Sequence, residues 1–292
     1  MEAGEIPATD FNQAVAEGRI EMIGAEVDRA YIDAAVALFR DHDRLDNRTR
    51  MRSYEAAMQA IVEEHPEDAE ARIFHAIFVV ATASPTDLTF AQQQRAAVVL
   101  NELYREHPNH PGLAHYIIHA FDAPPIAGEG LDAAMRYAEI APDAPHALHM
   151  PSHIFTRLGY WDESIETNRR AAEAEPTPDA AVHPLDYMVY AYLQQGRDAA
   201  AAEVVSRPRG QDVDRFYGGI LGYNSVAMSA RYALERGDWE AAAALPVPDE
   251  SALYVEAVPR FARAVGAARA GRPEAARADV MRLAELESAL VE

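Results

Sequence analysis

Residues 107–161, HPNHPGLAHYIIHAFDAPPIAGEGLDAAMRYAEIAPDAPHALHMPSHIFTRLGYW, decide the fold of this chain. Two prolines in this stretch, Pro108 and Pro142, stand 34 residues apart, and the next proline at that interval is Pro176. A proline closing every 34-residue unit is typical of an array of helix-turn-helix repeats. Because no segment shows the alternating pattern of a half-buried strand, the sequence predicts an all-α protein.

Apolar residues at helical spacing extend the pattern along the chain. Residues 1–22 are predicted to form an irregular N-terminal segment. Residues 23–292 are predicted to form a right-handed α-solenoid of tetratricopeptide-like (TPR-like) helical hairpins, best defined over 69–205. The predicted hairpin turns contain Gly159, Gly196, Gly237 and Gly271. The predicted helices cover residues 23–40, 49–64, 69–83, 90–106, 111–121, 131–140, 145–158, 162–174, 182–195 and 198–205.

Composition limits the chemistry and the partners of this protein. The chain has no cysteine, so disulfides and thiolate metal ligands are excluded. Its formal net charge of −21 argues against a nucleic-acid partner, because that affinity comes mainly from cationic side chains on phosphates. The N-terminus lacks a signal-peptide pattern, and the longest nearly apolar run, residues 73–81, is too short to cross a bilayer. We therefore expect a cytoplasmic protein with no membrane partner.

Seven of the eleven histidines lie in the quoted stretch, and four of them form two pairs. His115 and His119 are four residues apart in one predicted helix, and His149 and His153 are four apart in another. Imidazoles at this spacing project from the same helix face and can share a metal ion. Because neighbouring helices pack about 8–10 Å apart, the sequence predicts that both pairs bind one divalent transition metal: zinc, copper or iron.

Helix 145–158 is predicted to present its histidines away from its apolar stripe. Winding it at about 100° per residue gathers the apolar residues on one side and the histidines on the other, while Pro151 is expected to bend the helix. Aligning Gly159 with Gly196 places Asp186 opposite His149 and Tyr190 opposite His153. The first helix of each hairpin lines the concave surface of such an array. The predicted groove residues beyond the four ligands are His146, His183, Asp122, Asp186, Tyr116, Tyr187 and Tyr190.

Three functions fit this groove, and a purely structural role for the histidines is also open. The groove can bind a metal together with a small-molecule or peptide ligand, serve as a metal-free scaffold for a protein partner, or hold a metal with an open position for catalysis. The histidines can instead be hydrogen-bonding side chains packed between repeats. The chain contains no Walker loop, dinucleotide fingerprint, GxSxG or HExxH motif, so no catalytic residue is assigned.

Three segments resemble a large family of bacterial tetratricopeptide-repeat proteins. They are HPGLAHYIIHAFDAPP at 110–125, RYAEIAPDAPHALHMPSHIFTRLGYWDESIETN at 136–168 and HPLDYMVYAYLQQGRDA at 183–199. The resemblance covers about Tyr31 to Val205, implies the helical-repeat fold and implies no particular activity. It places these residues in the family's pattern: His115, His119, His146, His149, His153, His183 and Asp186.

Overall fold

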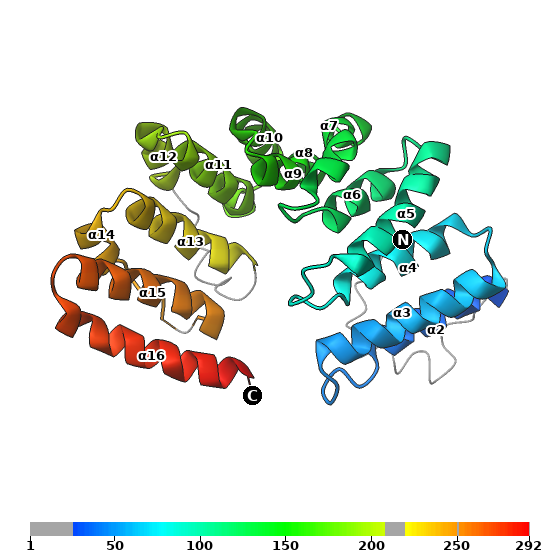
Figure 1. The fold of residues 1–292 in the computed structure, drawn as a ribbon, viewed down its shortest axis with the longest axis horizontal. Coiled ribbons are helices and arrows are strands. Elements are labelled where there is room, and N and C mark those ends of the chain that lie inside the picture. The colour runs from blue at the N-terminus through cyan, green and yellow to red at the C-terminus, as the bar shows by residue number, and fades with distance from the viewer. Residues whose placement is uncertain (1–25, 208–219, 250, 292) are drawn as a thin grey trace, which may run out of the picture. The chain divides into compact units, whose positions relative to one another are not determined.

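The computed structural model describes residues 26–207, 220–249 and 251–291 (Figure 1). Within these ranges the chain forms helices joined by turns and loops, and no strand. The helices pack in neighbouring pairs, which confirms the predicted all-α class. The predicted irregular segment 1–22 lies outside the described residues.

The chain divides into two compact units, and the first covers Met1–Phe121. In this unit each helix packs against the next along the chain, and α4 also packs against α6 (Figure 1). The first unit contains α2 (Glu26–Phe39), α3 (Asn47–Glu64), α4 (Ala69–Ala81), α5 (Ala91–Glu106) and α6 (Pro111–Ala120).

The second unit covers Asp122–Glu292 and carries most of the predicted site. Its later helices pack in chain order, and α13 contacts both α11 and α15 (Figure 1). The described elements are η1 (Ala127–Gly130), α7 (Leu131–Ile140), α8 (Pro145–His149), α9 (Pro151–Leu158), α10 (Trp161–Ala174), α11 (Val182–Gln194), α12 (Asp198–Val205), α13 (Ile220–Glu235), α14 (Trp239–Ala243), α15 (Leu253–Arg269) and α16 (Pro273–Val291).

The four predicted turn glycines all adopt the left-handed backbone conformation. Their φ angles are 76° at Gly159, 66° at Gly196, 66° at Gly237 and 79° at Gly271. Glycine reaches this region without the steric penalty that a Cβ atom brings, and it commonly follows the last turn of a helix. The prediction that these glycines end the first helix of a pair is confirmed.

Pro151 interrupts the helix predicted over 145–158. The regular helix ends at His149, Met150 connects the two parts, and Pro151 is the first residue of α9. Proline has no backbone N–H to donate to the preceding turn, so it is tolerated at the first position of a helix but not inside one. The break leaves His149 at the end of α8 and His153 in the first turn of α9.

The buried faces agree with the predicted apolar stripe. Ala147, Pro151, Ile154 and Phe155 are buried, while Leu158 is half-buried. Trp161 packs against a cluster of buried apolar residues that several helices of the second unit contribute. That cluster contains Ile165, Val182, Leu185, Met188, Val189 and Met228.

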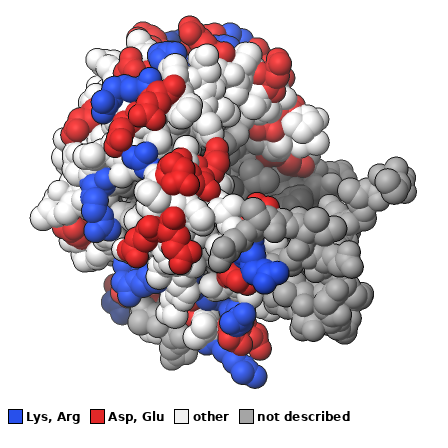
Figure 2. All heavy atoms as spheres, turned by 90° about the vertical axis from the view of Figure 1, so that its right-hand side faces the viewer, with Lys and Arg blue, Asp and Glu red and all other residues white. Residues whose placement is uncertain are grey.

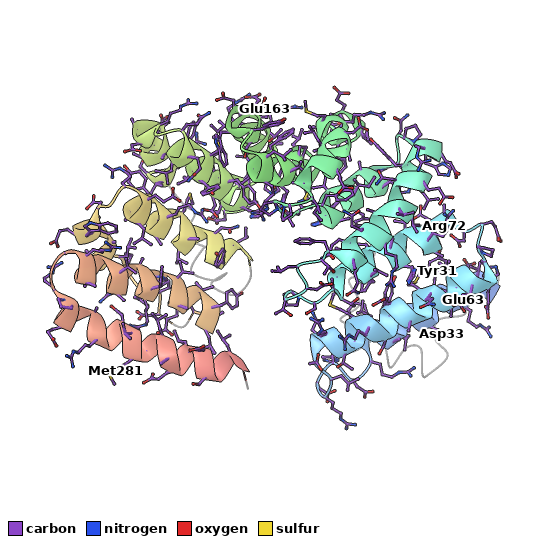
Figure 3. The ribbon with its side chains drawn as sticks, in the orientation of Figure 1. Tyr31, Asp33, Glu63, Arg72, Glu163 and Met281 are labelled. Carbon is purple, nitrogen blue, oxygen red and sulfur yellow. The ribbon has the colours of Figure 1, made fainter. Side chains whose placement is uncertain are left out.

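Basic and acidic side chains lie intermingled on the face drawn in Figure 2. One ion pair joins Arg72 of α4, labelled in Figure 3, to Glu102 of α5 at 3.1 Å. Exposed pairs of this kind contribute only about 0–1 kcal/mol, so burial of apolar residues stabilises the helix pairs more. No described helix is both long enough and apolar enough to cross a membrane.

Gly266 allows α15 to approach α14 closely, and we expect Gly266→Ala to destabilise the protein. An ideal Cβ atom at this position lies 2.5 Å from the backbone nitrogen of Ala243 and 2.7 Å from the carbonyl oxygen of Trp239. Overpacking against a rigid backbone costs about 1–3 kcal/mol, which outweighs the roughly 1 kcal/mol that alanine gains over glycine in a helix.

The matched control is Ala268→Gly at an exposed position of the same helix, where only the roughly 1 kcal/mol propensity loss applies. Urea unfolding of both variants and of the wild type measures the difference. A Gly266→Ala protein more stable than the wild type would contradict the close approach.

Candidate metal centre

Three histidines of the second unit lie in one cluster. His149 ends α8, His153 lies in α9 and His183 lies in the first turn of α11, and one nitrogen from each lies within 4.8 Å of the others. The Nε2 atoms of His149 and His153 are 3.0 Å apart. Two nitrogens bound to one tetrahedral zinc ion at about 2.0–2.1 Å are themselves roughly 3.3 Å apart. A small outward movement of the two rings therefore lets them share an ion, and the three histidines can hold one.

The outer nitrogens of His149 and His153 are held by side chains from other elements. The Nδ1 atom of His149 lies 2.6 Å from Oδ1 of Asn168 on α10, and Nδ1 of His153 lies 2.8 Å from Oδ2 of Asp122. An amide oxygen and a carboxylate only accept, so each Nδ1 carries the proton and donates. In the neutral form each Nε2 then keeps its lone pair for a metal ion; without a metal, the contact between the two Nε2 atoms is a hydrogen bond only when one of them carries a proton.

His183 is held in a similar way from the next helix pair. Its Nδ1 atom is hydrogen-bonded to the side-chain amide of Asn224, which lies on α13. With the amide nitrogen toward the ring, Nδ1 accepts; with the amide turned by about 180°, the oxygen of Asn224 accepts from Nδ1–H. The second orientation leaves Nε2 of His183 as the lone-pair nitrogen, as in His149 and His153.

The ring of Tyr187 packs among the three imidazoles. It lies one turn after His183 on α11, and its centroid is 4.9 Å from that of His149, 5.1 Å from that of His153 and 5.4 Å from that of His183. Its hydroxyl is 3.4 Å from Nδ1 of His153. The phenol therefore fixes the separation and tilt of the three rings.

Burial keeps two of the histidines in the neutral form. Burial lowers the pKa of His149 well below its usual value, and the nearby His183 and His153 lower it further. Burial, followed by the charges of His153 and His146, lowers the pKa of His183 to about 4. Because only the neutral imidazole can ligate a metal ion, both rings are ready to do so at neutral pH.

Asp122 connects His153 to an arginine. Its Oδ2 atom accepts from His153, and its Oδ1 atom accepts from Nε of Arg157 at 2.8 Å. Burial raises the pKa of this carboxyl, but the hydrogen bonds and charges of His153 and Arg157 together bring it below its usual value. Asp122 is therefore ionised and fixes the orientation of the His153 ring.

Asp186 and Tyr190 face a different partner from the one predicted. Asp186 is buried and forms an ion pair with Arg231 of α13, whose guanidinium carbon also lies 5.4 Å from the centre of the Tyr190 ring. Burial raises the pKa of Asp186 to about 6, although Arg231 acts in the opposite direction. Both residues therefore pack toward Arg231.

The predicted alignment of α9 with α11 is wrong by about one turn. The ring nearest to His149 across the helices is His183, with centroids 4.3 Å apart, and the counterpart of His153 is Tyr187. Both pairs are 34 residues apart, the interval of the prolines. From Tyr187 to its turn glycine Gly196, α11 is about one turn longer than α9 is from His153 to Gly159. Aligning the two glycines therefore places the wrong residues opposite His149 and His153.

The burial of His149 also differs from the prediction of a groove-lining residue. Its exposed fraction is 2%, so the imidazole lies inside the helix packing, whereas His146 is exposed. The centroid of the His146 ring is 6.2 Å from that of His149, and His146 is not among the three clustered donors.

The first unit contains the other predicted pair. The Nε2 atoms of His115 and His119 are 2.9 Å apart on α6, and the ring of Tyr116 lies 5.3 Å from that of His115. The geometry expected of two imidazoles four residues apart is therefore present within this unit. Because each unit is described by itself, it stays a prediction that this pair joins His149 and His153.

Two residues of the site were not predicted from the sequence, Asn168 and Asn224. Asn168 interrupts the buried face of α10, which otherwise consists of Ser164, Ile165 and Ala171, and a polar residue at such a position is a usable signal. Asn224 follows His183 by 41 residues, which is also the interval between Gly196 and Gly237. Aligning Gly196 with Gly237 therefore places Asn224 of the next hairpin at the position of His183.

No protein-family model and no curated protein matches this chain. Conclusions about its function therefore depend on the chemistry of the three imidazoles and the groups that hold them.

We expect acidification to destabilise the metal-free protein in part through His183. Its folded pKa of about 4 lies below the usual value of 6.5. As the pH falls through about 6.5, the unfolded chain takes up a proton that the folded protein does not, so unfolding becomes more favourable. Asp186 has the opposite effect on the free energy of unfolding. Because its pKa is raised in the folded protein, the folded state takes up this proton at a higher pH than the unfolded chain does.

Comparison of the wild type with His183→Gln isolates the contribution of His183. Between about pH 7 and about pH 5, the loss of unfolding free energy of chelator-treated protein should be smaller in the variant by on the order of 2 kcal/mol. Urea unfolding at both pH values measures it, and equal losses would contradict the lowered pKa.

Proposed function

We propose that this chain is a TPR-like helical-repeat protein that binds a divalent transition metal through His149, His153 and His183. The observation that carries this proposal is that each imidazole is held at Nδ1 by a side chain from another element. Such outer hydrogen bonds set the tautomer and the orientation of metal-ligating histidines. The Nε2 atoms of His149 and His153 lie 3.0 Å apart, a distance that fits an N–H···N hydrogen bond between the rings and also lies close to the separation of two nitrogens on one metal ion.

The donor set favours zinc, copper or iron. Imidazole nitrogen suits these ions, whereas magnesium and calcium prefer oxygen ligands. The clustered donors are all imidazoles, and the sequence contains no cysteine for a thiolate site. The 3.0 Å between the Nε2 atoms does not choose among these ions, because two ligands at about 2.0–2.1 Å lie roughly 2.9 Å apart at 90° and roughly 3.3 Å apart in tetrahedral geometry.

The helix contacts and turns of the second unit support the TPR-like interpretation. Helix α13 packs against α11 and α15, so the first helices of these successive hairpins are in contact. Four hairpin turns have a glycine in the left-handed conformation at the same place. In TPR-like repeats, these first helices line the ligand-binding surface. We infer that a small-molecule or peptide ligand binds there beside the metal, in a cytoplasmic protein similar to the bacterial TPR family.

The alternative functions differ in their metal dependence. A metal-free scaffold or a purely structural histidine cluster predicts no stoichiometric metal in protein purified without a histidine tag. If the protein is an enzyme that uses this site, it should contain stoichiometric metal and also convert a substrate. Elemental analysis of untagged protein therefore separates the first two from the proposal before any ligand is known.

We expect His149→Gln combined with His153→Gln to abolish stoichiometric zinc binding. Glutamine is close to histidine in size but lacks the ring nitrogen, so affinity should fall by more than about 100-fold. Isothermal titration with zinc and elemental analysis measure the loss, and circular dichroism checks that the helices are retained.

The matched control is His42→Gln combined with His107→Gln, which removes the same number of imidazoles from exposed positions outside the cluster. It should bind zinc as the wild type does. If the first variant keeps its zinc, or if both variants lose it equally, the assignment to this cluster is wrong.

Asp122→Asn should weaken zinc binding without removing a ligand. The amide is neutral and cannot favour the Nδ1-protonated form of His153 as a carboxylate does, so affinity should fall by about 10-fold or more. Arg157→Gln is the control, because it removes the second partner of Asp122 and leaves the contact to His153 in place. A larger loss in Arg157→Gln than in Asp122→Asn would argue against this role for Asp122.

A further inference from the structure

Among the described residues of the second unit, the cluster supplies three ligands to the proposed metal. Three imidazoles cluster, and a zinc ion needs at least four donors. Sites with three protein ligands keep the fourth position for a molecule from outside the chain. The identity of that molecule follows from the groups around the three histidines.

The carboxylates beside the cluster, Asp122 and Asp186, already form hydrogen bonds and ion pairs with other side chains. Asp122 uses both oxygens, one on Nδ1 of His153 and one on Arg157, and Nδ1 lies on the opposite side of the ring from the ligating Nε2. Asp186 is buried and ion-paired with Arg231. Moving either carboxylate onto the metal would break its ion pair with an arginine, and moving Asp122 would also remove the hydrogen bond that orients His153.

The charges around the site cancel without the metal. The histidines contribute no charge in the form that ligates, and each aspartate is matched by one arginine, Asp122 by Arg157 and Asp186 by Arg231. A divalent ion held by three neutral imidazoles therefore keeps its full charge in partly buried surroundings. An anionic ligand lowers the free energy of such a centre more than a neutral one does.

Two of the three imidazoles are partly exposed. His149 is buried, but the His153 side chain is 13% exposed and His183 is half-buried. A ligand would approach the metal on the side of these two residues. The space is limited by the ring of Tyr187, which contacts all three imidazoles.

We propose that the metal held by His149, His153 and His183 binds a small carboxylate-bearing ligand at its remaining position. A carboxylate binds through one oxygen and needs few other donors. A phosphate presents three charged oxygens that require several unpaired cationic donors, and the two arginines beside the site are each paired with an aspartate. This inference rests on the proposed metal-binding function and specifies the class of ligand for that site.

The test uses the full chain loaded with cobalt(II), whose visible absorption reports its coordination. Acetate titration should produce a saturable shift of the absorption bands with a one-to-one stoichiometry. Sodium perchlorate at the same ionic strength, which does not coordinate, should produce none, and phosphate should require a higher concentration than acetate. The His149→Gln protein should lose both the bands and the response.

Three results overturn the inference, and they are distinguishable. Failure to bind cobalt at all removes the metal-binding function and the ligand with it. Cobalt that binds but does not respond to acetate shows a closed site, in which a further protein group such as His146 occupies the fourth position. A response to phosphate at a lower concentration than to acetate shows that carboxylate is the wrong class of anion.

Discussion

Burial of the His149 imidazole is the constraint on which the site depends. A polar ring that is 2% exposed must have hydrogen-bonding partners, because an unpaired buried donor costs about 1–3 kcal/mol. Asn168 supplies the partner for Nδ1 and itself donates to the backbone oxygen of Ser164 at 2.7 Å. This chain of bonds ties α8 to α10 and leaves the other nitrogen of His149 facing His153.

The helix break at Pro151 lies between His149 and His153 but is not required for their contact, because His115 and His119 on the unbroken α6 are equally close. Proline ends the regular hydrogen bonding of α8 and begins α9, so His149 and His153 are carried by different helical segments with their Nε2 atoms adjacent. Packing of α11 then adds His183 and Tyr187 at the 34-residue interval. A metal at this cluster would join the α8–α9 segment to α11; the outer hydrogen bonds of the three rings already connect these elements to α10 and α13.

Another buried carboxylate of the second unit pairs with arginines of a neighbouring helix, as Asp186 beside the histidines does. Asp279 of α16 is 4% exposed and accepts from Arg260 and Arg263 of α15, as Asp186 of α11 pairs with Arg231 of α13. All 26 basic residues of the chain are arginine, whose planar guanidinium suits buried pairing with a carboxylate. The few cations of this acidic chain therefore stabilise contacts between neighbouring helices.

The sequence by itself determined the helices, their turns and the break at Pro151, because each depends on local chemistry: apolar spacing, a positive φ at glycine and a missing proline N–H. It also identified His149 and His153, since four-residue spacing places both on one face. The tertiary structure alone decided that His149 is buried, that His183 and Tyr187 are its neighbours in place of Asp186, and that Asn168 and Asn224 hold the rings. The repeat intervals, 34 residues for His183 and Tyr187 and 41 for Asn224, are present in the sequence, but the choice between the proline and glycine alignments and the burial of each ring depend on how separate helices pack.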